Sequence, residues 1–363
     1  MIHISRSGRK HPFYIRLLGL VLSLLALATC LAWLITEKIY EGLLEERIES
    51  KSYYKMYLED FAGLQATQYE FSSDQGQKLV GYLYYTNKAP QGIIIFSHDL
   101  GSGQNYYMDC ANYFAQNGFY VFTFDGTGHD ESEGDGIRGL RQGVIDLDYA
   151  ISFVETSGNF PELPIGLFGH GLGGYSACAV LDKHPEVKAV VSCSGFNKPA
   201  DMIKGLLKNA MGGWSNLLMM FFKLHDWRRF GSDTSLTAMD GLAASEAAVM
   251  IINSEDNDTV PMELGFDKFY QKYKDDSRFV FVRCQEGNHA PFIDSSYLNE
   301  LQEVSKNWEN TLDYDTTAQE NRERYQMEED AFWKENLDRE RWTNRLNLDL
   351  MGKILSFYNE NLR

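Results

Sequence analysis

The sequence is poor in cysteine and has no paired cysteine motif. Its 363 residues include five cysteines, and no two of them form a C-x-x-C pair. This spacing argues against a zinc site or a dithiol redox motif. No motif for a metal, a nucleotide or a flavin occurs either, so we expect no cofactor. Whether an exported domain pairs any of its scattered cysteines stays open; these are Cys110, Cys178, Cys193 and Cys284.

Basic residues are also scarce. The chain has 34 Lys and Arg against 51 Asp and Glu, a formal net charge of −17. Such an acidic chain is unsuited to electrostatic binding of nucleic acid or anionic membrane surfaces, and we expect no nucleic-acid partner. The simpler interpretation is that the charge keeps a domain soluble.

One long apolar run stands near the N-terminus. Residues 17–35 carry no charge and are long enough for a helix that crosses a bilayer. Residues 1–16 are basic, so the positive-inside rule predicts a cytoplasmic N-terminus and a main domain outside the cell membrane. The alternative is a signal peptide cleaved at the A-x-A site of residues 26–28. Apolar residues continue beyond that site, which favours an uncleaved anchor, and both interpretations export the domain.

The remainder of the chain has the pattern of an α/β domain. Residues 36–64 are charged with helical spacing and predict a stalk or first helix. Over residues 65–363, short apolar runs then alternate with helical stretches. Such runs predict a mostly parallel sheet with helices on both faces. The main predicted strands are 92–97, 120–124, 165–168, 187–194, 247–253 and 278–284.

Two segments interrupt this alternation. Residues 197–244 lack a strand pattern and predict a helical cap above the sheet. Its cluster of Met219, Met220, Phe221 and Phe222 either lines an apolar pocket or forms the cap's own core. Residues 297–345 predict a charged helical insertion before a last amphipathic helix. A role for that insertion in protein interaction would require it to project from the domain.

Five motifs follow the predicted strands in order: "FSHDLGSG", "FDGTGHDESEG", "GHGLGG", "INSEDNDTVP" and "EGNHAPF". With these motifs the chain resembles the α/β-hydrolases, in particular the serine aminopeptidase S33, monoacylglycerol lipase and lysophospholipase-like group. The resemblance covers about residues 65–300 and the final helix. It implies an α/β-hydrolase fold and acyl transfer by a serine, an acid and a histidine in that chain order.

The resemblance also shows which catalytic positions are altered. Gly171 stands at the position of the nucleophilic serine, and a glycine has no group that attacks a carbonyl. Asn257 stands at the acid position, with Asp256 and Asp258 beside it as candidate substitute acids. A neutral amide does not stabilise an imidazolium as a carboxylate does. His289 matches the histidine of the family.

The oxyanion site is altered as well. The resemblance assigns the two oxyanion donors to the N–H groups of Leu100 and Leu172. Asp99 stands where the family usually has glycine, and an inward carboxylate there would oppose the developing negative charge. Asp130 replaces a glycine of the fourth-strand loop. Because several positions depart together, natural decay of the site is favoured over a single engineered change.

Two hypotheses of function follow. The first is a membrane-anchored pseudo-hydrolase that keeps a pocket for an acyl, ester or peptide ligand, or that binds an unidentified protein partner. The second is an active esterase, lipase or peptidase for lysolipids, acylglycerols or short peptides that uses another nucleophile. The nearest hydroxyl and thiol groups are Ser97, Ser176 and Cys178. The last two lie one and two helical turns beyond the strand-to-helix turn, which places them far from His289.

Overall fold

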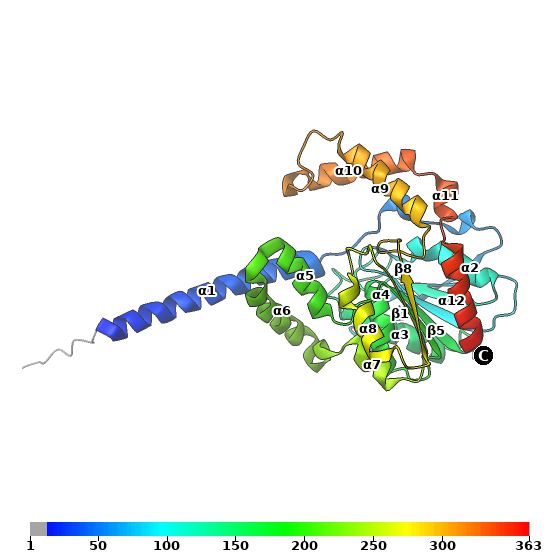
Figure 1. Ribbon diagram of the computed structural model, residues 1–363, viewed down its shortest axis with the longest axis horizontal. Helices are drawn as coiled ribbons and strands as arrows, with labels where there is room; N and C mark the ends of the chain where they lie inside the picture. Colours follow the sequence, from blue (N-terminus) through cyan, green and yellow to red (C-terminus); the bar gives the residue numbers. More distant parts are fainter. Residues whose placement is uncertain (1–12, 363) are drawn as a thin grey trace, which may run out of the picture.

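The computed structural model of the chain describes residues 13–362 and is built around one eight-stranded sheet (Figure 1). The strand order is β1-β2-β4-β3-β5-β6-β7-β8. Neighbouring strands are parallel from β4 to β8 and antiparallel between β1, β2 and β4, so the predicted mostly parallel sheet is confirmed. The strands are β1 (Gln65–Ser72), β2 (Lys78–Tyr85), β3 (Ile93–Ser97), β4 (Tyr120–Phe124), β5 (Ile165–His170), β6 (Ala189–Cys193), β7 (Ala248–Ser254) and β8 (Phe279–Cys284).

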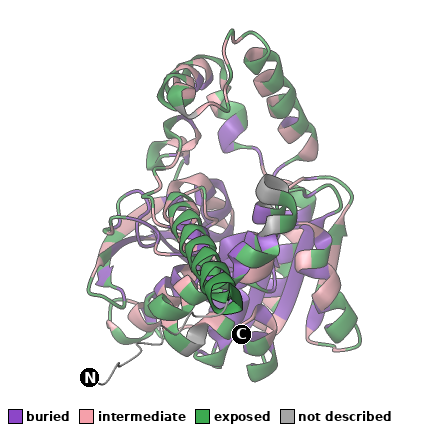
Figure 2. Cartoon of the chain, turned by 90° about the vertical axis from the view of Figure 1, so that its left-hand side faces the viewer, coloured by how far each residue is buried: buried purple, intermediate pink, exposed green. Residues whose placement is uncertain are grey.

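Helices cover both faces of this sheet and bury its apolar strands (Figure 2). Successive residues of one strand point to opposite faces, so Ile93 and Ile95 belong to one hydrophobic core and Ile94 and Phe96 to the other. The first core contains α3 (Gln142–Thr156), α4 (Leu172–Ala179) and α8 (Phe266–Tyr273). The second contains α2 (Met108–Gln116) and α12 (Leu348–Asn361). Two buried layers thus hold the sheet rigidly beneath its loops.

The turn between β5 and α4 is tight and depends on glycine. Gly171 has φ 53° and ψ −113°, a left-handed conformation that favours glycine. A Cβ at Gly173 would lie 1.9 Å from the backbone oxygen of Ser97. The absence of side chains therefore lets the start of α4 lie directly against the end of β3.

We expect Gly173→Ala to lower the free energy of unfolding by about 1–3 kcal/mol, because a methyl group there displaces the backbone after β3. Gly352→Ala is the matched control. Gly352 lies within α12 and a Cβ there meets nothing within 4 Å, so alanine should leave stability unchanged or slightly raised. Chemical denaturation of the two variants checks this, and equal midpoints would contradict it.

The N-terminal part differs from the expected stalk. Helix α1 (Phe13–Leu44) is long and apolar enough to cross a membrane, a test that signal sequences also pass. It continues past the apolar run and ends at Leu44, after which two short 3₁₀ helices follow, η1 (Ser52–Tyr54) and η2 (Leu58–Asp60). Residues 45–64 lie on the domain, since Tyr53, Met56 and Phe61 are buried. Residues 1–12, which hold most of the predicted basic segment, are outside the described residues.

The segment 197–244 is helical, but it lies beside α1 (Figure 1). It contains α5 (Pro199–Met211), α6 (Ser215–Phe230) and α7 (Ala238–Ala244). Helix α6 packs against the C-terminal part of α1, where the Tyr40 hydroxyl donates a 2.8 Å hydrogen bond to Asp226. Met219, Phe221 and Phe222 are buried, whereas Met220 is exposed. The cluster therefore serves as packing between helices.

The C-terminal insertion forms a helical arm beyond the edge of the domain (Figures 1 and 2). It contains α9 (Ser295–Glu309), α10 (Arg322–Asn336) and α11 (Arg339–Thr343). The arm is tied back to the N-terminal segment, because Trp333 stacks on Tyr53 and Glu329 pairs with Lys51. Residues far apart in the sequence thus meet above the loops of the sheet.

Candidate active site

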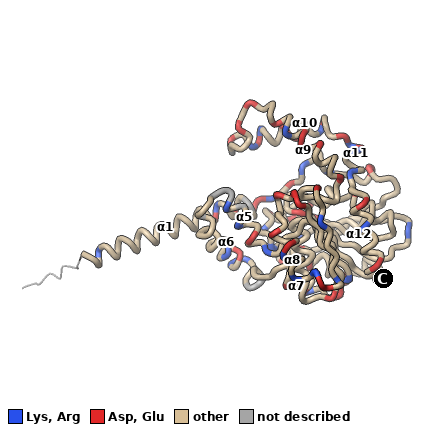
Figure 3. The backbone as a smooth tube through the Cα atoms, in the orientation of Figure 1, with Lys and Arg blue, Asp and Glu red and all other residues tan. Residues whose placement is uncertain are grey.

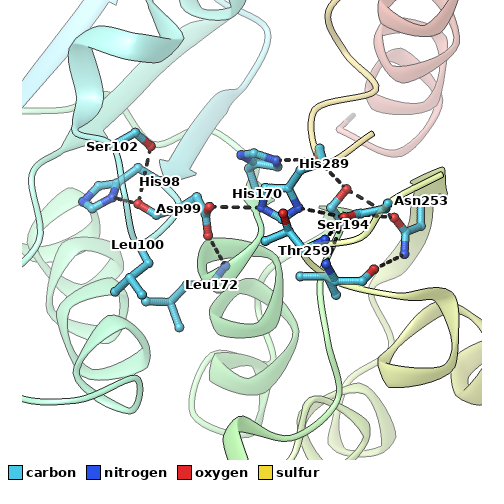
Figure 4. A network of polar contacts seen from close by, with 12 residues as sticks. His98, Asp99, Leu100, Ser102, His170, Leu172, Ser194, Asn253, Thr259 and His289 are labelled. Atoms are coloured by element: carbon cyan, nitrogen blue, oxygen red, sulfur yellow. Dashed lines mark hydrogen bonds and ion pairs between the residues drawn. The ribbon is translucent and has the colours of Figure 1, made fainter. Parts of the chain in front are cut away.

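Loops from four strands meet at the carboxyl ends of the parallel sheet (Figure 4). Asp99 follows β3, Gly171 follows β5, Asn257 follows β7 and His289 follows β8. The ring of His289 lies between two of these groups: its Nδ1 is 3.3 Å from Asn257 Oδ1, and its Nε2 is 3.0 Å from Asp99 Oδ2. The structure therefore brings together the residues that the motifs indicated, and it places the Asp99 carboxylate in contact with His289.

The carboxylate of Asp99 points inward and occupies the space beside Gly171. A Cβ built on Gly171 would lie 2.0 Å from Asp99 Oδ1. The same oxygen accepts a 2.8 Å hydrogen bond from the backbone N–H of Leu172, the predicted oxyanion donor. The Asp99 carboxylate thus takes the place of a side chain at residue 171 and also accepts the hydrogen bond of one predicted oxyanion donor.

The environment of Asp99 stabilises its charged form. Burial alone would raise the pKa of this carboxyl group, but the charge and hydrogen bond of His289, together with His170 and the Leu172 amide, hold the pKa well below its usual range. The neighbouring hydrogen bonds orient His289 as well. Asn257 Oδ1 accepts the backbone N–H groups of Thr259 and Val260, so it faces His289 as an acceptor.

This orientation engages both ring nitrogens of His289. Its Nδ1 must donate to Asn257, so a hydrogen bond from Nε2 to Asp99 requires a second proton on the ring. When the ring carries both protons, the contact with Asp99 is an ion pair. A histidine in this state has no lone pair with which to accept a proton from a nucleophile.

The other two acids near Asn257 point elsewhere. Asp256 accepts the backbone N–H groups of Gly287 and Asn288, which shapes the loop that carries His289. Asp258 is exposed. Among the described residues, Asn257 is therefore the group in contact with His289 Nδ1, and neither flanking acid takes that place. The carbonyl of Leu100, the second residue assigned to the oxyanion site, contacts His129 Nε2 at 2.9 Å.

A cavity of about 290 Å³ opens in front of Asp99 and His289. Residues of the N-terminal segment line one side of it, among them Lys51, Tyr54 and Lys55. Asp130 holds this segment in place, because its carboxylate accepts hydrogen bonds from Ser50 and Lys55.

Sequence reasoning identified Asp130 only as an unusual residue in a loop and missed this function. Its partners lie about 80 positions away, in a segment without a motif, so no sequence signal indicates the contact.

Comparisons with known proteins agree with this fold. Residues 88–255 match the family model described as "Serine aminopeptidase, S33". The structure resembles that of a Pyrococcus furiosus esterase with a TM-score of 0.54 and 16% identity, over 72% of this chain and 97% of that one. The chain has the α/β-hydrolase fold.

Two curated relatives match a smaller part of the chain. The monoglyceride lipase of Rattus norvegicus is 30% identical over 112 residues, or 30% of the chain and 36% of the relative. The monoacylglycerol lipase of Mycolicibacterium smegmatis is 24% identical over 131 residues, or 36% of the chain and 46% of the relative. The matched segments thus span less than half of each relative.

The three alternative nucleophiles named from the sequence are buried. Ser176 is fully buried, and its hydroxyl donates to the carbonyl of Leu172. Burial raises the pKa of the Cys178 thiol to about 12, which disfavours the reactive thiolate. Ser97 is 6% exposed. Within the part of the chain that the structure describes, the ring of His289 bonds to Asn257 and Asp99 and to none of these three groups.

Two sets of side chains among the described residues have the composition of a metal site, and one of them, which lies in this centre, contains Asp99. Asp99, His170 and His289 each offer a ligand atom, and these atoms lie within 4.8 Å of one another. Both ring nitrogens of His170 already have partners, the hydroxyl of Tyr107 and the backbone oxygen of His289, each at 2.8 Å. Hydrogen bonds therefore satisfy this cluster without an ion.

Because His170 is buried in its neutral state, we expect the free energy of unfolding to depend on pH. Burial and the nearby charge of His289 lower the pKa of His170 to about 4. Between this value and about 6.5 an unfolded chain binds a proton at this residue that the folded chain does not, so stability falls as the pH falls through this window. We expect a slope of up to about 1.4 kcal/mol per pH unit from His170. Urea unfolding at several pH values should show a shallower dependence for His170→Gln, and an unchanged slope would contradict this origin.

Proposed function

We propose that this α/β-hydrolase is a membrane-anchored pseudoenzyme that binds a small acyl or ester ligand and does not hydrolyse it. The observation that carries the proposal is the position of Asp99. Its carboxylate fills the space of a nucleophile at residue 171, accepts the Leu172 N–H and pairs with His289. Serine-type acyl transfer needs a nucleophile at residue 171, a free Leu172 N–H for the oxyanion and a His289 ring that accepts a proton. The Asp99 carboxylate occupies all three places.

Ligand binding is supported by the cavity beside the closed centre. Its volume of about 290 Å³ and its rings of Tyr54, Tyr106 and Tyr107 suit part of an apolar chain or a small ester. The two curated relatives are lipases of monoacylglycerols by name, so an acylglycerol is the ligand that we favour.

The membrane anchor is supported by α1. Its apolar stretch, Phe13–Gly42, is long and apolar enough to cross a bilayer, and its most apolar part is not buried against the domain. Figure 2, in which α1 points toward the viewer, shows this exposure. A helix of this composition is unstable in water unless it is covered, and a bilayer covers it. With the basic residues on its N-terminal side, the domain lies outside the cytoplasm.

Two measurements on the full chain in detergent test the function. Hydrolysis of a short-chain p-nitrophenyl ester and of 1-monooleoylglycerol should not exceed that of the His289→Ala variant. Turnover that His289→Ala abolishes would reject the pseudoenzyme and favour the active hydrolase with another nucleophile.

Binding of 1-monooleoylglycerol is then measured by titration calorimetry. Ser102 lines the cavity, so Ser102→Trp should remove binding by filling it. Thr156→Trp, at an exposed position at the end of α3, is the matched control. Equal binding by both variants would show that the ligand does not use this cavity.

A further inference from the structure

Helix α6 presents a second apolar face that no part of the described chain covers. Leu217, Met220, Leu224 and Trp227 are 42%, 60%, 43% and 59% exposed. Their spacing of three and four residues places them along one side of the helix. The buried residues of α6, such as Leu218 and Phe222, lie on the other side and pack inward. An exposed apolar stripe of this kind usually marks a surface that meets a partner or a lipid.

Helix α6 packs on α1 near the end of the apolar run, through residues other than those of the stripe. Trp33 lies near the end of the apolar run of α1, and its ring stacks on His225 at 4.2 Å and meets Phe221 edge-on at 6.1 Å. Tyr40 packs on Phe222 and His225 one to two turns further along. Helix α6 therefore crosses α1 at the level where the span ends, and tryptophan and tyrosine favour that level of a membrane.

Basic side chains lie around α6, and Glu37, Glu41 and Glu45 of α1 line the same hollow as Arg228. Although the chain is acidic, this region carries the exposed basic residues Lys204 and Lys208 on α5 and Lys223 and Arg228 on α6. Among the described residues, none of these four has an ion pair with a carboxylate in the structure. Helix α1 itself is almost free of charge along its apolar part (Figure 3). Basic side chains beside an apolar stripe are typical of helices that lie in the interface of an anionic bilayer.

We propose that α6 lies flat in the interface of the lipid bilayer that α1 spans, with Leu217, Met220, Leu224 and Trp227 inserted among the acyl chains. The occupant of this surface is phospholipid, with anionic headgroups facing the lysines and arginine. This proposal rests on the membrane anchoring proposed above. A second contact beside α1 stops the domain from tilting freely about its anchor, and the cavity at Asp99 then keeps one orientation toward the membrane.

Spin labels on the full chain test this placement. Met220→Cys and Trp227→Cys are labelled with a nitroxide, in a background with Cys30→Ala and Cys284→Ala, since the remaining cysteines are buried. The matched control is Met327→Cys on α10, which is 74% exposed and lies far from α6 (Figure 1). All are reconstituted in vesicles of phosphatidylcholine and phosphatidylglycerol, and collisions with oxygen and with a water-soluble nickel chelate are measured.

The labels at 220 and 227 should be accessible to oxygen and protected from nickel, with the reverse at 327. Labels at 220 and 227 as accessible to nickel as the one at 327 would overturn the proposal. Alkaline carbonate extraction distinguishes a wrong placement of α6 from a wrong assignment of α1 as a membrane anchor. If the chain stays in the membrane fraction while these labels are in water, only the placement of α6 is wrong. If carbonate releases the chain, the anchoring and this inference both fail.

Discussion

The double variant Asp99→Gly, Gly171→Ser should hydrolyse p-nitrophenyl esters, whereas Gly171→Ser alone should remain inactive. In the single variant, the new Cβ lies 2.0 Å from Asp99 Oδ1, so the serine and the carboxylate compete for one space. The Leu172 N–H and His289 Nε2 also stay engaged with that carboxylate. Removal of the Asp99 side chain releases both groups, and the turn at residue 171 already has the strained conformation of a nucleophile turn.

The esterase activity that the double variant gains depends on the residue at position 257, which is Asn257 in this chain. An amide at the acid position supports the orientation of His289 but not the charge of an imidazolium, a loss of roughly 10⁴-fold in turnover in serine proteases. The triple variant that adds Asn257→Asp should therefore exceed the double variant by up to roughly 10⁴-fold. His289→Ala in the triple background is the control, and it should remove the activity.

Two results would contradict this explanation of the inactive centre. Activity in Gly171→Ser alone would show that Asp99 moves aside readily. Inactivity of the triple variant, with its fold retained by circular dichroism, would show that the oxyanion site or the cavity has decayed beyond the three replaced side chains.

The sequence predicted the arrangement of the site better than its state. The motif order placed Gly171, Asn257 and His289 after three different strands, which are β5, β7 and β8 in the structure, because parallel strands bring their carboxyl ends to one edge of the sheet. It left open whether Asp99 points inward, since a side-chain direction depends on partners that are distant in the sequence. His289 is 190 positions from Asp99. Only the folded chain shows that the carboxylate replaces the missing side chain.

The supporting segments were harder to predict. Residues 45–64 have charges at helical spacing, but Tyr53, Met56 and Phe61 are buried against the domain, and this tertiary packing overrides the local pattern. The segment predicted as a cap is helical, but the sequence assigned its apolar residues to a pocket or to the cap's own core and not to a partner helix. Helix α1 is that partner, and an apolar run near the N-terminus is usually interpreted only as an anchor.

Arg345→Met should be the most destabilising single substitution near the site, at about 3–5 kcal/mol. Arg345 follows the C-terminal arm and is fully buried, with its Nε 2.8 Å from Asp109 Oδ2. Its guanidinium group also donates to the carbonyl of Tyr106 at 2.6 Å and lies between the rings of Tyr106 and Trp342. The substitution leaves the Asp109 carboxylate buried without its cation, and desolvation of that charge is the cost.

A surface pair provides the matched control. Arg341 binds Glu300 through two 2.8 Å hydrogen bonds, but both side chains are about half exposed, so Arg341→Met should cost no more than about 1 kcal/mol. Adding Asp109→Leu to Arg345→Met removes the unpaired charge and should recover part of the loss. Urea unfolding followed by tryptophan fluorescence measures all three, and a loss in Arg345→Met no larger than in Arg341→Met would contradict the prediction.

The buried pair of Arg345 and Asp109 also links stability to the cavity. Arg345 fixes Tyr106, and Tyr106 and its neighbour Tyr107 both line the space in front of Asp99. The Tyr107 hydroxyl in turn bonds to His170 and to the backbone N–H of Asp99. Loss of the buried arginine should therefore weaken ligand binding as well as the fold, whereas Arg341→Met should leave binding unchanged. Calorimetric titration of both variants with 1-monooleoylglycerol, below their unfolding temperatures, separates a positioning role of Arg345 from a purely structural one.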